Sequence, residues 1–173
     1  FIHHQYIREI NLENNFLINF SFNDFVLNSF VNINFKNNSI QFTIEDSPLS
    51  QMNLLECIDF SFNQIERVHF QDLFDSNNIL KEVYLNNNKI KFIKDDLFMK
   101  FKRLKILNLQ FNQINLIDEY ALYYLDLLEN LLLSNNNITN LNINTFNGLI
   151  QLRYLNLSSN FISYLNQNIF RNC

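Results

Sequence analysis

The sequence is poor in the residues that build many small folds: it has one glycine, one proline, two cysteines and no tryptophan in 173 residues. Glycine and proline supply the backbone angles of tight turns, so their scarcity argues against a hairpin-rich barrel. Two cysteines, Cys57 and Cys173, are too few for a domain held together by disulfides. No apolar run approaches the roughly 18 residues that span a bilayer. These absences leave a chain whose fold depends on an apolar core.

The charges also exclude several functions. The net charge is −4, and acidic and basic residues are scattered along the chain. Because no basic stripe could neutralise phosphates, we expect no nucleic-acid binding. No glycine-rich phosphate loop and no Ser/His/Asp or Cys/His arrangement can be assembled, so we expect no catalytic residues and no cofactor.

Histidines and paired carboxylates give no better candidates for a metal or catalytic site. His3 and His4 are adjacent near the start of the chain, and His69 has no companion ligand nearby in the sequence. Asp95 and Asp96 could be paired catalytic carboxylates, but capping of the turn that follows them is the simpler interpretation. We therefore predict that the chain binds no metal and is not an enzyme.

Asparagine is abundant, with 33 residues, and seven of these recur in an apolar frame. The frame is L-x-x-L-x-L-x-x-N-x-I, with Ile, Phe or Val in some apolar positions. Its matches begin at Ile7, Phe30, Leu55, Leu80, Leu104, Leu128 and Leu152. The asparagines are Asn15, Asn38, Asn63, Asn88, Asn112, Asn136 and Asn160. Their spacings of 23, 25, 25, 24, 24 and 24 residues predict a solenoid over residues 1–173.

Each repeat can be interpreted physically. The x-L-x stretch alternates between inward and outward positions, which is the period of a strand. One short strand per repeat would stack in parallel on the next, about 4.8 Å away. Only about a dozen residues remain for the return, and they lack a helical pattern. The sequence thus predicts seven short parallel strands on one side and an irregular or 3₁₀ return on the other.

The repeated asparagine has a structural explanation. The chain must bend after each strand, which leaves backbone N–H and C=O groups facing inward. The asparagine side chain has both a donor and an acceptor, and an unpaired buried polar group costs about 1–3 kcal/mol. We therefore expect all seven side chains to be buried and bonded to backbone.

The return segments repeat as well. One apolar position per repeat lies ten or eleven residues after the asparagine, at Phe25, Leu49, Phe74, Phe98, Leu122, Phe146 and Phe170. Three residues later, a second apolar position is occupied by Met52, Phe101, Leu125, Leu149 and Cys173. We expect both sets to be buried, with Cys173 acting as a small hydrophobic residue.

This pattern resembles the leucine-rich repeat of the typical 24-residue type, which has a phenylalanine in its return segment. The resemblance covers nearly the whole chain and recurs seven times. It implies a right-handed horseshoe of the α/β class, with strands on the concave face and an irregular or 3₁₀ convex side. It also implies kinship with secreted or cell-surface proteins such as Toll-like receptors, Slit-like proteins and small leucine-rich proteoglycans. The cysteine-rich caps of such proteins are not visible, so we expect an internal segment of a longer protein.

The outward strand positions suggest a binding site. Core packing does not require apolar residues there, yet four occur in the C-terminal half, at Tyr84, Ile106, Leu132 and Tyr154. We predict that they form an exposed patch that binds a protein partner. Phe62 and Phe111, each directly before a repeat asparagine, are expected to pack locally.

Three functions remain open. The resemblance favours the ligand-recognition segment of a cell-surface receptor or matrix protein, located outside the cell. An intracellular scaffold or regulatory subunit and the recognition arm of a larger enzyme are the alternatives. Four N-x-S/T sequons occur, at Asn19, Asn37, Asn137 and Asn156. Because composition alone predicts about three, they do not decide the location, and the sequence leaves both the ligand and the oligomeric state open.

Overall fold

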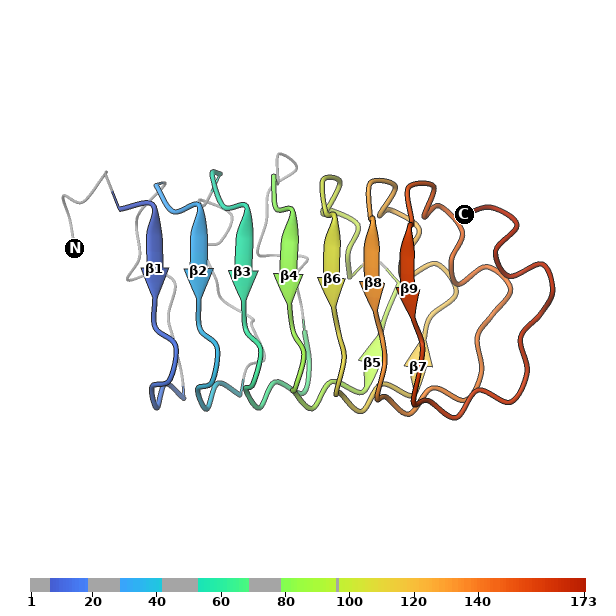
Figure 1. Ribbon diagram of the computed structural model, residues 1–173, viewed down its shortest axis with the longest axis horizontal. Coiled ribbons are helices and arrows are strands. Elements are labelled where there is room, and N and C mark those ends of the chain that lie inside the picture. Colours follow the sequence, from blue (N-terminus) through green and yellow to red (C-terminus); the bar gives the residue numbers. More distant parts are fainter. Residues whose placement is uncertain (1–6, 19–28, 42–52, 69–78, 96) are drawn as a thin grey trace.

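The computed structural model describes residues 7–18, 29–41, 53–68, 79–95 and 97–173, and their strands lie side by side as successive turns of a solenoid (Figure 1). Seven strands of three residues form one sheet in the order β1-β2-β3-β4-β6-β8-β9, with every neighbouring pair parallel. They are β1 (Glu9–Asn11), β2 (Asn32–Asn34), β3 (Cys57–Asp59), β4 (Glu82–Tyr84), β6 (Ile106–Asn108), β8 (Asn130–Leu132) and β9 (Tyr154–Asn156). The predicted sheet and its repeat register are confirmed.

The register stacks equivalent motif positions on one another. Glu82 pairs with Ile106, Val83 with Leu107, and Tyr84 with Asn108, and the other strands continue these rows. The middle residue of each strand from β2 to β8 is buried, while its two neighbours are partly exposed. Each motif position therefore becomes a continuous row along the solenoid, either in the core or on the surface of the sheet.

The repeated asparagines join adjacent turns. Asn112 Nδ2 donates hydrogen bonds to Leu109 O at 3.0 Å in its own turn and to Leu85 O at 2.9 Å in the preceding one. Its Oδ1 accepts the Ile90 N–H at 3.0 Å. Asn38, Asn63, Asn88, Asn136 and Asn160 make the equivalent three contacts. Each side chain satisfies backbone groups that the bend would otherwise leave unpaired.

The first asparagine departs from this arrangement. Asn15 is exposed, and its Nδ2 donates only within its own turn, to Leu12 O at 3.0 Å and Glu13 O at 3.2 Å. The expectation that all seven side chains are buried is therefore wrong for Asn15. Among the described residues no turn precedes it, so no neighbouring carbonyl is available. Asn160, in the last turn, is half-buried.

The residue before each asparagine has a left-handed backbone. Its φ lies between 52° and 60° in all seven turns, at Asn14, Asn37, Phe62, Asn87, Phe111, Asn135 and Ser159. Asparagine tolerates this conformation better than most residues, which explains the recurring Asn-Asn pairs. Phe62, Phe111 and Ser159 are the exceptions, and 45% of the Phe62 surface and 52% of the Phe111 surface remain exposed. Local packing, including Lys36 Nζ at 5.9 Å from the Phe62 ring centroid, therefore accounts for only part of each ring.

The return side is closed by the predicted apolar rows in the central turns. Phe98, Leu122 and Phe146 are fully buried, and so are Phe101, Leu125 and Leu149. Backbone hydrogen bonds between residues three apart shape these turns, such as Phe101 N to Phe98 O at 3.0 Å. Phe25, Leu49, Met52 and Phe74 lie outside the described residues.

The two predicted apolar rows are not buried at the C-terminal turn. Phe170 stacks on Phe146 with ring centroids 5.6 Å apart, but 48% of it is exposed. Cys173 is also exposed, which corrects the expectation of a buried side chain. Among the residues described, no later turn covers either side chain.

A second sheet lies on the return side and was not predicted. It pairs β5 (Phe92–Ile93) with β7 (Leu116–Ile117) in parallel (Figure 1). Ile93 and Ile117 are buried, whereas Phe92 and Leu116 are exposed, so even two residues show the strand alternation. The described part of the return side contains no helix.

Candidate functional site

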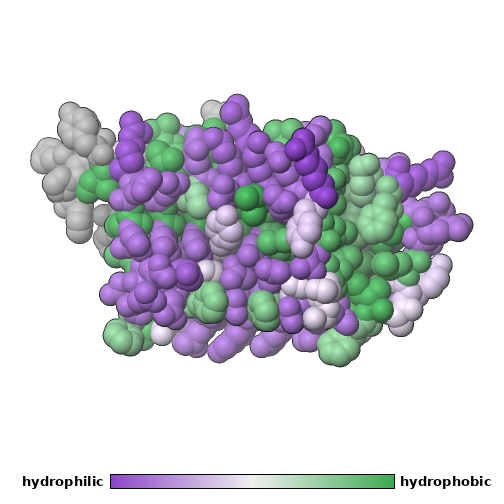
Figure 2. All heavy atoms as spheres, in the orientation of Figure 1, coloured by the Kyte–Doolittle hydropathy of each residue, from purple (hydrophilic) through white to green (hydrophobic). Residues whose placement is uncertain are grey.

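The surface of the seven-stranded sheet, called the strand face here, consists of the first and third residues of each strand. Of the four predicted binding residues, Tyr84, Ile106 and Leu132 are half-buried on this face, and Tyr154 is 52% exposed. None occupies the middle, core-facing position of its strand. Figure 2, which views the sheet from the front, shows mainly hydrophilic residues over the strands, whereas hydrophobic residues gather at the C-terminal end of the solenoid, beyond β9.

The register arranges these four residues in a zigzag. Tyr84 lies in the row of Asn108 and Leu132, whereas Ile106 lies in the row of Asn130 and Tyr154. Each apolar residue is therefore the diagonal neighbour of the next one on the adjacent strand. Such diagonal positions are about 7–8 Å apart, within reach of long and aromatic side chains. We call Tyr84, Ile106, Leu132 and Tyr154 the apolar stripe.

Polar side chains flank the stripe. Asn108, Asn130 and Asn156 occupy the strand positions between its members and are partly exposed. Their Nδ2 groups can donate hydrogen bonds to a ligand, whereas the Oδ1 atoms of Asn108 and Asn156 already accept the N–H groups of Gln110 and Ser158. The stripe therefore combines apolar contact area with groups that could orient a ligand.

The N-terminal end of the stripe meets an acidic group of side chains on β3 and β4. The Tyr84 hydroxyl donates a hydrogen bond to Glu82 Oε2 at 2.9 Å, and Asp59 Oδ1 accepts the Ser61 N–H at 2.7 Å. Burial raises the pKa of the Cys57 thiol to about 12, and the neighbouring Glu82 and Asp59 carboxylates add to this shift. Burial and the hydrogen bond to Glu82 likewise raise the pKa of Tyr84. Both groups are thus neutral at physiological pH.

This environment predicts an unreactive thiol at Cys57, because the thiolate is the nucleophile. At pH 8, iodoacetamide should alkylate Cys57 much more slowly than the exposed Cys173, as followed by peptide mass spectrometry. Glu82→Gln removes a nearby negative charge, lowers the thiol pKa and should speed the alkylation of Cys57. Equal rates at the two cysteines in the wild-type chain would contradict this environment.

Of the other candidate residues, only Asp95 lies within the described part of the chain. Asp95 connects two turns: its carboxylate accepts the Tyr120 N–H at 3.0 Å, and its own N–H donates to Asp118 Oδ2 at 3.2 Å. His3, His4, His69 and Asp96 lie outside the described residues. In the part of the chain that is described, no group of His, Cys, Asp or Glu side chains could hold a metal ion. Over the same ranges, no helix has the length and apolar character needed to cross a membrane.

A cluster of exposed aromatic residues on the return segment was missed by the sequence analysis. Tyr123 makes edge contacts with Tyr120 at 6.2 Å and with Tyr124 at 5.5 Å between ring centroids. Lys102 Nζ lies 4.3 Å from the Tyr124 ring centroid. Tyr120 precedes the buried Ala121 and Leu122, and Tyr123 and Tyr124 lie between Leu122 and the buried Leu125, so their exposure could have been found by applying the repeat frame to the return segment.

The repeat is also recognised by comparison with known proteins. The family model described as leucine rich repeat matches residues 78–138 and 126–173, which together make up more than half of the chain. The chain belongs to the leucine-rich repeat family. The leucine-rich repeat is a protein-interaction module, and folds of this kind are typically not enzymes. No curated protein matches the chain.

Solved structures share this leucine-rich repeat fold. An internalin, InlF from Listeria monocytogenes, is 23% identical with a TM-score of 0.73 and is matched over 96% of this chain and 46% of its own. InlJ from Listeria monocytogenes, whose functional domain includes a cysteine ladder, is 25% identical with a TM-score of 0.68. The match covers 94% of this chain and 32% of InlJ. Internalin C2 from the same species is 21% identical with a TM-score of 0.64, and the match covers 92% of this chain and 75% of internalin C2. The chain thus spans less than half the length of the first two.

Proposed function

We propose that this leucine-rich repeat chain is the ligand-recognition segment of an extracellular receptor or matrix protein, and that it binds a protein through its concave strand face. The apolar stripe is the observation on which the proposal depends. Its four side chains are at least partly exposed and lie at outward positions of neighbouring strands in the sheet, where core packing does not require an apolar residue. Tyrosine is enriched among the residues that dominate binding energy at protein interfaces.

The surroundings of the stripe favour a protein over an anionic ligand. The outward positions of the seven strands include Glu9, Asp59 and Glu82 but no lysine or arginine. A nucleic acid would meet uncompensated negative charge here. The amides of Asn108, Asn130 and Asn156 would instead suit the polar groups of a polypeptide, which also presents apolar side chains.

The extracellular location rests on the typical-type repeat, which resembles those of secreted and cell-surface proteins. Imaging of the tagged native protein on unpermeabilised cells tests it. Surface or medium staining supports the location, whereas staining only after permeabilisation would favour the intracellular scaffold.

Binding can be tested without knowing the natural ligand. Small protein domains displayed on yeast would be selected for binding to the full chain. Their affinities would then be measured by biolayer interferometry against the alanine variants of Tyr84, Ile106, Leu132 and Tyr154. Because hot-spot residues each contribute upward of about 1.4 kcal/mol, we expect each variant to weaken binding roughly tenfold or more.

The matched controls are Phe92→Ala and Leu116→Ala, which remove exposed apolar side chains from the second sheet. They should leave the affinity of the selected domains unchanged. Domains that tolerate all four stripe variants but lose binding with Tyr123→Ala would place the binding surface on the return side and overturn the proposal.

A further inference from the structure

The four sequons of the chain differ in how the fold presents them. In the sequon of Asn137, the middle residue Ile138 is fully buried, while Asn137 and Thr139 are both exposed. The alternation therefore turns the amide and the hydroxyl of this sequon toward solvent together. Ile138 is the apolar position of the repeat frame after Asn136, so the core itself holds the sequon in this orientation.

The Asn137 amide is also free to react. Its backbone N–H donates to Ile114 O at 2.8 Å, but within the described residues its side chain makes no hydrogen bond. Thr139 Oγ1 accepts only the neighbouring Asn140 Nδ2, at 3.2 Å. Attachment of a group to Asn137 Nδ2 would thus break no hydrogen bond that stabilises the turn.

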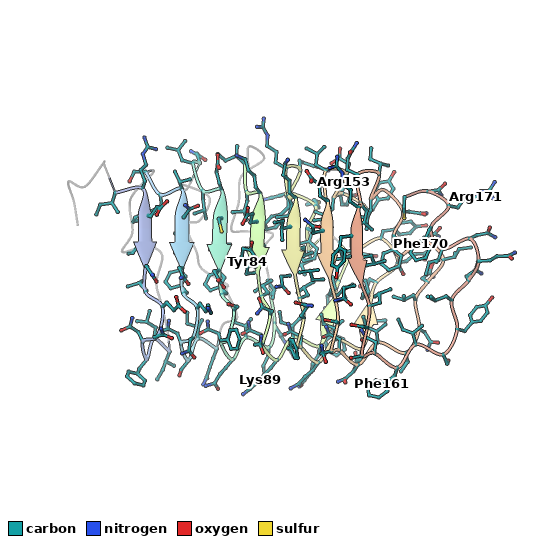
Figure 3. All side chains as sticks on the ribbon, viewed as in Figure 1. Tyr84, Lys89, Arg153, Phe161, Phe170 and Arg171 are labelled. Carbon is teal, nitrogen blue, oxygen red and sulfur yellow. The ribbon has the colours of Figure 1, made fainter. Side chains whose placement is uncertain are left out.

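The position of Asn137 keeps an attached group away from the apolar stripe. It directly follows its repeat asparagine, as Lys89 follows Asn88 and Phe161 follows Asn160. Figure 3 shows Lys89 and Phe161 at the edge beyond the C-terminal ends of the strands, opposite the edge that bears Arg153. A bulky group in this row would extend from the side of the solenoid and leave the strand face open.

The other described sequons are less suitable. Asn156 lies on β9 opposite Leu132 in the register, and its Oδ1 accepts hydrogen bonds from Ser158 N at 3.0 Å and Ser158 Oγ at 2.7 Å. A glycan there would cover the stripe. Asn37 is exposed, but its Nδ2 already donates to Asn14 Oδ1 at 2.7 Å. Asn19 lies outside the described residues.

We propose that Asn137 is an N-glycosylation site whose substrate is a lipid-linked oligosaccharide diphosphate. Asn137 Nδ2 forms a bond to the anomeric carbon of the sugar, and the bond between that carbon and the diphosphate oxygen breaks. The electron pair leaves with the lipid diphosphate, and the amide nitrogen gives up one proton to water. This inference rests on the proposed extracellular location and does not depend on which ligand the strand face binds.

The test uses the full chain expressed behind a secretory leader in eukaryotic cells. Secreted and retained pools are both digested with peptide N-glycosidase in heavy-oxygen water, which marks each formerly glycosylated asparagine as labelled aspartate. We expect label at Asn137 in the wild type. Asn137→Gln and Thr139→Ala should each increase gel mobility by the loss of one glycan, whereas Asn156→Gln should not change it.

Failure of the site and failure of the location give different results. An unlabelled Asn137 in the leader-routed chain, or a glycan retained on Asn137 in Thr139→Ala, would overturn the site. A labelled leader-routed chain beside an unlabelled chain from the native source supports the acceptor site and shows that the native chain does not pass through a glycosylating secretory pathway.

Discussion

Replacing Asn112 by alanine is expected to lower the free energy of unfolding by roughly 2–6 kcal/mol. The Ile90 N–H loses the Asn112 Oδ1 acceptor, and a buried unsatisfied donor costs about 1–3 kcal/mol. The carbonyls of Leu85 and Leu109 each keep one amide, from Asn88 and Asn136, but lose the bond to Asn112. Each of those bonds contributes about 0.5–1.5 kcal/mol.

Asn15→Ala is the matched control, because Asn15 occupies the same motif position in an exposed turn and, among the described residues, bonds only within that turn. It should cost less than about 1 kcal/mol. Turns of a solenoid can open separately, so denaturant melts should be combined with hydrogen exchange of the strand amides. Equal losses of unfolding free energy for Asn112→Ala and Asn15→Ala would show that the hydrogen bonds between turns contribute little to stability.

Replacing Phe98 by alanine should cost about 3–5 kcal/mol, the usual range for a fully buried phenylalanine. Phe98 has no exposed surface and contacts Phe101 edge-on, with ring centroids 5.8 Å apart. Both rings belong to the buried hydrophobic core, and the asparagines hold the surrounding turns in register. The cavity that the Phe98→Ala substitution leaves therefore cannot easily be filled by movement of the surrounding turns.

Phe92→Ala is the control for this variant, since it removes the same side chain from an exposed position six residues away. Denaturant melts of the two variants and the wild type give the comparison. A loss for Phe98→Ala of less than about 1 kcal/mol, or one equal to that of Phe92→Ala, would mean that this row does not form the core.

The repeat made most of the fold predictable. A period of about 24 residues fixed the strands, their parallel order and their register, because every inward position is constrained by its equivalents in adjacent turns. The β5–β7 pair could not be predicted in the same way. Two residues are too few for a periodic signal, and their pairing depends on how the return segments happen to align.

The turns at the two ends differed from the central ones for a related reason. Asn15, Phe170 and Cys173 match the motif as well as their central equivalents, yet all three are exposed. Their burial depends on a neighbouring turn and not on the residue itself. Sequence motifs specify which groups face inward, whereas burial requires an adjacent turn that covers them.

The candidate site was predictable in position but not in detail. The outward location of Tyr84, Ile106, Leu132 and Tyr154 followed from strand alternation. Their zigzag arrangement and the hydrogen bond between Tyr84 and Glu82 required the register and the side-chain conformations.

Site-specific photo-crosslinking tests the central claim, that a protein partner occupies the strand face, most directly. Benzoylphenylalanine would replace Ile106 on the strand face in one sample and Leu116 on the second sheet in another. Each full-length protein would be irradiated with the display-selected domains, and the adducts would be mapped by mass spectrometry. The proposed binding mode predicts a covalent adduct from position 106 and none from position 116. An adduct from position 116 alone would contradict it.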